Sequence, residues 1–171
     1  MRLYLKPLFM GEQESLSVDG EVDLSALEYR GEHPFAHPVR VQGAVTVDAD
    51  IVTLRAVASF LYEGNCDRCT TAFRREMRVP VEHVLVTSLN SEDSDRYVLV
   101  DNYQLPLDEL VREDLILSLP TKSLCRDDCR GLCPRCGKNL NEGLCGCRAV
   151  TVDPRLEALR QLMTGEDDFL S

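Results

Sequence analysis

Apolar and polar residues alternate along much of the first half of the chain, a period of two that is typical of strands with one buried face. The clearest apolar row is Val52, Leu54, Ala56, Ala58, Phe60 and Tyr62. A second row follows the stretch CDRCTTA and is Phe73, Met77, Val79, Val81, His83 and Leu85, opposite a charged face of Arg74, Glu76, Arg78 and Glu82. An earlier row is Val39, Val41, Val45 and Val47, interrupted by Gly43 and ended by a turn at Asp48-Ala49-Asp50. Together these segments predict an antiparallel meander.

Shorter elements flank the meander. We expect a strand over 1–8, a polar stretch after it, weak periodicity over 22–27, a loop over 90–96 and a short strand over 97–100. Apolar residues at helical spacing then predict a helix over 107–119, which Pro120 ends. A second helix is expected over 151–165, with Asp153 as its N-cap and Pro154 in its first turn.

Composition and charge narrow the function classes. The 171 residues are 44% hydrophobic and 28% charged, which is typical of a globular domain, and no apolar run is long enough to span a bilayer. A net charge of −10 argues against a protein that binds nucleic acid over its whole surface. The segment from Lys122 to Arg148 is the exception, because basic residues outnumber acidic ones there. We expect a cytoplasmic protein with no membrane partner and no small-molecule substrate.

Six of the eight cysteines lie between Cys125 and Cys147. In reducing surroundings, clustered cysteines usually indicate metal or redox chemistry rather than disulfides. The CPRCG stretch has the two-residue gap of a zinc knuckle, and CGC follows nine residues later. This spacing predicts one four-sulfur zinc site, made by Cys133, Cys136, Cys145 and Cys147. We expect Gly131, Gly137, Gly143 and Gly146 to supply positive φ angles where the loop wraps the ion.

The other four cysteines admit more than one interpretation. If the helix over 107–119 ends near the turn that carries CDRC, a second zinc ion would be shared by Cys66, Cys69, Cys125 and Cys129. Free thiols at a hairpin tip, a redox pair and an iron–sulfur cluster are alternatives. An all-cysteine set is usually closed and structural, and no nucleophile, nucleotide-binding loop or paired acid and base stands out. We therefore expect no catalytic residues and no enzyme.

The predicted fold class is α+β: an antiparallel β-meander core with a packed helix, a C-terminal cysteine-rich zinc module and a short C-terminal helix. The expected domains are a core over 1–120, a zinc module over 121–150, the helix over 151–165 and a flexible tail over 166–171.

The run CRDDCRGLCPRCGKNLNEGLCGC, with DPRLEALRQLM after it, resembles the YceD family of large ribosomal RNA subunit accumulation proteins. CDRCTTAF after a strand and the stretches DLSALE and LVREDLILSLP support the resemblance. It implies a role in making or keeping large-subunit (23S) ribosomal RNA, and it places the family's cysteine motif on all eight cysteines.

These observations lead to one main hypothesis and one alternative. The main hypothesis is a non-enzymatic zinc-binding factor in ribosome biogenesis. Its partner would be large-subunit ribosomal RNA or a ribosome assembly protein, contacted by Arg126, Arg130, Arg135, Lys138 and Arg148. The alternative is a thiol-based redox or zinc sensor, whose cysteines release metal on oxidation.

Overall fold

The computed structural model describes residues 1–88 and 96–147. These residues divide into two compact units, of which the first ends at Cys129 and the second begins at Arg130. The first unit is of the α+β class, as predicted, and holds every named helix and strand. The expected C-terminal helix over 151–165 and the tail over 166–171 lie outside the described residues, as does most of the expected loop over 90–96. Along the described chain, no helix is long and apolar enough to cross a membrane.

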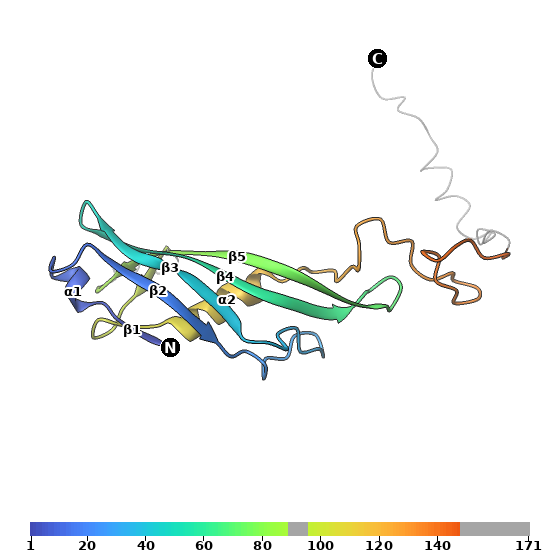
Figure 1. Ribbon diagram of the computed structural model, residues 1–171, viewed down its shortest axis with the longest axis horizontal. Helices are drawn as coiled ribbons and strands as arrows, with labels where there is room; N and C mark the ends of the chain where they lie inside the picture. The colour runs from blue at the N-terminus through green and yellow to red at the C-terminus, as the bar shows by residue number, and fades with distance from the viewer. Residues whose placement is uncertain (89–95, 148–171) are drawn as a thin grey trace, which may run out of the picture. The chain divides into compact units, whose positions relative to one another are not determined.

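A five-stranded sheet forms the body of the first unit, in the order β2-β3-β4-β5-β6 (Figure 1). Its strands are β2 (Ser15–Val22), β3 (Val39–Asp48), β4 (Ile51–Asn65), β5 (Ala72–Val86) and β6 (Tyr97–Leu99). The first four pair antiparallel, whereas β6 runs parallel to β5. The predicted meander is confirmed as β3-β4-β5, and its longest hairpin, β4-β5, carries CDRC at its tip.

Burial follows the predicted alternation. All six members of the Val52–Tyr62 row are buried, and so are Val79, Val81 and Leu85 of β5. Helix α2 (Leu107–Ser118) contacts β5 and adds its own apolar face, which includes Leu110, Val111 and Leu115, to the same core. His83 Nε2 lies 2.8 Å from Asp114 Oδ2, so the histidine in the apolar row joins the sheet to α2. This contact gives His83 a structural role in the packing of α2 on the sheet.

The N-terminal prediction was wrong in part. The expected strand over 1–8 is a short strand, β1 (Arg2–Tyr4), which pairs with β7 (Gln104–Pro106), followed by helix α1 (Lys6–Phe9). Pro7 explains the change, because its fixed φ suits the first turn of a helix and its missing N–H weakens a strand. Strand β2 lies in the expected polar stretch, where it pairs with β3 across its full length.

Gly43 does not interrupt β3 as expected, since the strand continues through it. It pairs with Ala56, and a Cβ atom on Gly43 would lie 2.2 Å from the Arg55 carbonyl oxygen. The glycine therefore permits a close approach of two strands. The expected turn does form, with positive φ at both Ala49 and Asp50, as a tight two-residue hairpin requires.

Candidate metal centres

The eight cysteines form two clusters of four, one in each compact unit. The hairpin cluster is Cys66, Cys69, Cys125 and Cys129, and the terminal cluster is Cys133, Cys136, Cys145 and Cys147. Within each cluster all four sulfurs lie within 4.8 Å of one another, so each could hold a metal ion. None of the eight cysteines, all of which lie in the described part of the chain, forms a disulfide. The terminal grouping is the one that the cysteine spacing predicted, and the hairpin grouping corresponds to one of the interpretations left open for the other four cysteines.

Sulfur spacing in the hairpin cluster fits a tetrahedral ion. The Sγ atoms of Cys66 and Cys129 are 3.7 Å apart, and those of Cys69 and Cys125 are 3.6 Å apart. Metal–sulfur bonds of about 2.3 Å in a tetrahedron separate the sulfurs by about 3.8 Å. A disulfide would need about 2.05 Å. Cys66, Cys69 and Cys129 are buried and Cys125 is half-buried, so the centre of this cluster is largely shielded from water.

Both clusters contain a CxxC turn with the same backbone hydrogen bonds. In the β4-β5 tip, Cys66 N–H donates to the Thr71 carbonyl at 3.0 Å and Thr70 N–H donates to the Cys66 carbonyl at 2.8 Å. In the terminal cluster, Cys133 N–H donates to the Lys138 carbonyl at 2.8 Å and Gly137 N–H to the Cys133 carbonyl at 2.9 Å. CDRCTT and CPRCGK therefore build the same knuckle twice.

The segment that carries Cys125 is fastened to the hairpin tip by a reciprocal contact. Asp67 N–H donates to the Ser123 carbonyl at 2.7 Å, and Ser123 N–H donates to Asp67 Oδ2 at 2.8 Å. The Tyr62 hydroxyl and Ser123 Oγ share a buried hydrogen bond of 2.6 Å. These bonds hold two distant parts of the sequence in register, so the sulfurs of Cys66 and Cys125 can converge.

Two arginines complete the attachment. Arg68 Nη1 donates to the Cys129 carbonyl at 2.8 Å, and Arg75 Nη2 donates to the Leu124 carbonyl at 3.1 Å. Both arginines thus bond the backbone beside the hairpin cluster. Like Asp67, Ser123 and Tyr62, they act around the cluster, and no motif in the sequence marked that role. The only local signal was the position of Asp67 and Arg68 inside CDRC.

Backbone donors set the charge of the first cysteine in each knuckle. Burial opposes ionisation of Cys66, yet amide groups of Cys125, Cys69 and Arg68 lower the pKa of its thiol to about 6. The amides of Cys136 and Arg135 likewise lower the pKa of Cys133 to about 6. These two sulfurs are thus prepared as thiolates, the form that binds metal.

One other cysteine in each cluster behaves in the opposite way. Burial, together with the other cluster thiols, raises the pKa of Cys125 to about 12. Hydrogen bonding to Cys136, followed by burial, raises the pKa of Cys147 to about 12. Four sulfurs packed together cannot all carry charge without a compensating cation. The arrangement therefore favours a divalent or higher-valent metal in each cluster.

The terminal cluster is held by a short loop rather than by a sheet. Leu132 and Asn139 form an isolated bridge, Leu140 N–H donates to the Gly131 carbonyl at 2.9 Å, and the Asn141 side chain accepts from Arg130 N–H at 2.8 Å. Positive φ angles occur at three of the four expected glycines, Gly131, Gly137 and Gly143. Gly146 has none, so that expectation was wrong: the chain passes between Cys145 and Cys147 without a left-handed turn.

Exposed cations lie close to both clusters in the sequence. Arg126, Arg130, Arg135 and Lys138 are exposed, while Arg148 lies outside the described residues. Arg126 pairs with Asp128 at 3.3 Å, and Lys138 Nζ donates to the Leu144 carbonyl at 3.2 Å. Exposed pairs of this kind are worth little energetically, so these side chains can exchange their contacts for those of a partner.

No solved structure matches the chain. Uncharacterized proteins of Mycobacterium tuberculosis and Mycobacterium bovis are 30% identical to it over 112 residues, which are 63% of this chain. The chain spans about half the length of these curated relatives, since the match covers 53% of each.

The family described as "Large ribosomal RNA subunit accumulation protein YceD" matches residues 54–163. The matched segment begins in β4 and contains both cysteine clusters, so it covers the fold elements that build the hairpin cluster as well as the terminal loop. The resemblance inferred from the cysteine motif is therefore confirmed, and the chain belongs to the YceD family of large ribosomal RNA subunit accumulation proteins.

Proposed function

We propose that this chain is a non-enzymatic factor that binds two zinc ions and supports the accumulation of large-subunit ribosomal RNA in the cytoplasm. The family supplies the link to large-subunit ribosomal RNA. The observation that carries the metal part is the pair of four-sulfur clusters, each with its sulfurs within 4.8 Å. The proposed role of the metal is structural, because four protein sulfurs leave no open coordination position for a substrate.

Zinc is the metal that the donor set favours. Four thiolates at tetrahedral spacing suit zinc or iron–sulfur chemistry, and an isolated ion fits sulfur separations of 3.6 and 3.7 Å. Bound zinc would also offset the negative charge of the thiolates. Each zinc would offset two of the four thiolate charges, so the exposed cations beside the clusters would be needed for any contact with phosphate.

We propose that RNA is contacted by Arg126, Arg130, Arg135, Lys138 and Arg148. The whole chain carries −10, and acidic residues dominate outside the segment from Lys122 to Arg148, so phosphate contact would concentrate on the cysteine-bearing segments. On this proposal the zinc module extends over 121–150, and the core domain over 1–120 serves to present it. The segments over 151–165 and 166–171 are proposed to be a helix and a flexible tail.

Metal analysis of the purified full chain is the first test. We expect about two zinc ions per chain. Cys66→Ser and Cys133→Ser, each removing one ligand from a different cluster, should each reduce the content to about one. Iron in place of zinc, or a single ion unaffected by Cys66→Ser, would contradict the proposal.

RNA binding is the second test. The zinc-loaded chain should bind single-stranded RNA with an affinity that falls steeply as salt increases, because phosphate contacts release counterions. Arg135→Gln and Lys138→Gln should both flatten that slope, whereas Arg40→Gln, which removes a cation paired with Asp19 on the sheet, should not. No measurable binding at low salt would leave an assembly protein as the partner.

A further inference from the structure

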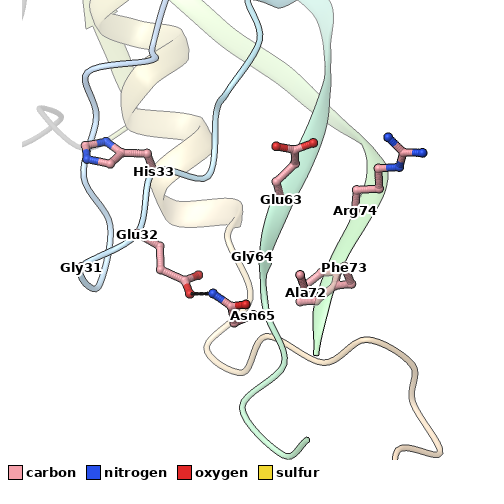
Figure 2. Close-up of a pocket in the computed structure, with 9 residues that line it drawn as sticks. All are labelled: Gly31, Glu32, His33, Glu63, Gly64, Asn65, Ala72, Phe73 and Arg74. Carbon is pink, nitrogen blue, oxygen red and sulfur yellow. Dashed lines mark hydrogen bonds between the residues drawn. The ribbon is translucent and has the colours of Figure 1, made fainter. Parts of the chain in front are cut away.

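An open cavity of about 700 Å³ lies beside the hairpin cluster and is lined only by residues of the first unit (Figure 2). Its walls come from the loop before β3 and from the facing ends of β4 and β5: Gly31, Glu32, His33, Glu63, Gly64, Asn65, Ala72, Phe73 and Arg74. The volume falls within the range of ligand sites in proteins. Asn65 immediately precedes Cys66, so the cavity and the metal centre share one hairpin end.

A tight turn places the Glu32 carboxylate in this cavity. Tyr29 and Glu32 exchange two backbone hydrogen bonds, of 2.8 and 3.1 Å, around Arg30 and Gly31, which both have positive φ. Glu32 Oε1 accepts a hydrogen bond from Asn65 Nδ2 at 2.9 Å, which orients the carboxylate across the cavity (Figure 2). A carboxylate oxygen accepts more than one hydrogen bond, so both oxygens of Glu32 can still receive donors from a ligand.

Gly64 keeps space open next to that carboxylate. A Cβ atom at this position would lie 3.0 Å from Glu32 Oε2 and 3.9 Å from the Phe73 ring. Phe73 is half-buried, and its ring already receives the Arg75 guanidinium on one side at 5.6 Å. The cavity therefore combines an oriented acceptor pair, an apolar aromatic wall and the cation Arg74 at its margin.

We infer that this cavity is a subsite for an unstacked guanine base of single-stranded RNA. Guanine carries two adjacent donors on one edge, N1–H and N2–H₂, which match the two oxygens of a single carboxylate. Adenine and cytosine offer one amino donor each, and uracil flanks its lone N–H with two carbonyl oxygens that a carboxylate repels. Exposed bases of single-stranded RNA are commonly read in this way, by edge hydrogen bonds and aromatic contact.

The surroundings favour RNA over a basic peptide as the occupant. Glu32 and Glu63 alone would suit an arginine or lysine side chain, but Arg74 lies on the same rim and Arg75 covers part of Phe73. These cations repel a basic side chain and attract the phosphate next to a bound base. The inference rests on the proposed function, because it adds to the proposed RNA binding a contact that recognises a base.

The test compares two RNAs of equal charge on the zinc-loaded full chain. A fluorescently labelled octamer of uridine and the same octamer with one central guanosine are titrated and followed by anisotropy. We expect the guanosine octamer to bind about tenfold more tightly. Glu32→Gln should abolish that difference, because its amide can still accept from Asn65 but sets a donor against the donors of guanine. Glu76→Gln, the same change on β5 outside the cavity, should preserve it.

Gly64→Ala gives a second and independent variant, since its methyl group displaces the Glu32 carboxylate and should reduce the preference. Zinc content and circular dichroism establish that each variant is folded. Equal binding of both octamers by the wild type would overturn the guanine subsite while leaving RNA contact intact. Binding of neither octamer would overturn both proposals. A Glu32-dependent affinity for an arginine-rich peptide, with no base preference, would assign the cavity to a protein partner and overturn the inference.

Discussion

Thr70 occupies in the hairpin knuckle the place that Gly137 occupies in the terminal knuckle. Both residues have positive φ, 56° and 72°, and each donates its N–H to the carbonyl of the first cysteine of its CxxC, at 2.8 and 2.9 Å. Left-handed backbone is costly for a residue with a Cβ branch and easy for glycine. The hairpin knuckle therefore carries strain that the terminal knuckle avoids.

Replacing Thr70 with glycine should raise the free energy of unfolding of the zinc-loaded chain by about 1 kcal/mol, because the relieved left-handed strain exceeds glycine's entropic cost. Gly137→Thr should lower it by a similar amount. Urea unfolding followed by circular dichroism measures both changes. A less stable Thr70→Gly variant would mean that the hydrogen bond from Thr70 Oγ1 to the Cys69 carbonyl, 2.8 Å long, outweighs the strain.

Ser123→Ala should cost about 1–3 kcal/mol of unfolding free energy, because it leaves the buried Tyr62 hydroxyl without its partner. Adding Tyr62→Phe removes both groups, so the double variant should be less destabilised than the sum of the two single variants. Strict additivity of the three values would contradict a direct bond between these residues. In the presence of a chelator, the variant with the lowest unfolding free energy should also lose zinc from the hairpin cluster fastest, because the bond between Tyr62 and Ser123 helps to position Cys125.

Much of the hairpin cluster could be predicted from the sequence because strand alternation is a local signal. The Val52–Tyr62 row fixed which face of β4 is buried, and two long rows separated by CDRC implied a hairpin with cysteines at its tip. Predicting where Cys125 lies also required the direction in which α2 runs along the sheet. Its apolar residues indicated packing on the sheet, and Pro120 indicated where the chain turns away.

The contacts that fasten the cluster could not be predicted in the same way. Asp67 and Ser123 are 56 positions apart, and their reciprocal bonds depend on the register with which the segment after α2 meets the hairpin. The cavity could not be predicted for the same reason, because Glu32 and Asn65 come from separate elements. Strand β2 was missed for a different reason: its apolar row, Leu16, Val18 and Val22, is short and is interrupted by Gly20.

Gly43→Val should destabilise the fold by about 3 kcal/mol, although valine is a better strand former than glycine. The added side chain would meet the backbone of β4, where the Arg55 carbonyl oxygen lies 2.2 Å from the position of a Cβ atom. Ala44→Val, at the next residue of β3, is a suitable control because Ala44 is half-buried and has a Cβ already. Thermal denaturation compares the two. Equal midpoints would show that β3 and β4 separate there at no cost.

Mild oxidation should release zinc from the terminal cluster before the hairpin cluster. Cys136 and Cys147 are exposed, whereas Cys66, Cys69 and Cys129 are buried. Peroxide attacks accessible thiolates first. Zinc release during peroxide treatment should therefore proceed in two steps of about one ion each. Mass spectrometry of alkylated peptides should find Cys136 and Cys147 modified in the first step.

Reversal of that first step by a thiol reductant decides between the two roles considered for the cysteines. A sensor requires that reduction restore the lost zinc and that RNA affinity change with the first ion alone. A structural module requires only that the fold of the terminal loop depend on its ion. Simultaneous loss of both ions would contradict the difference in exposure on which this prediction rests, because it would mean that the two clusters open together.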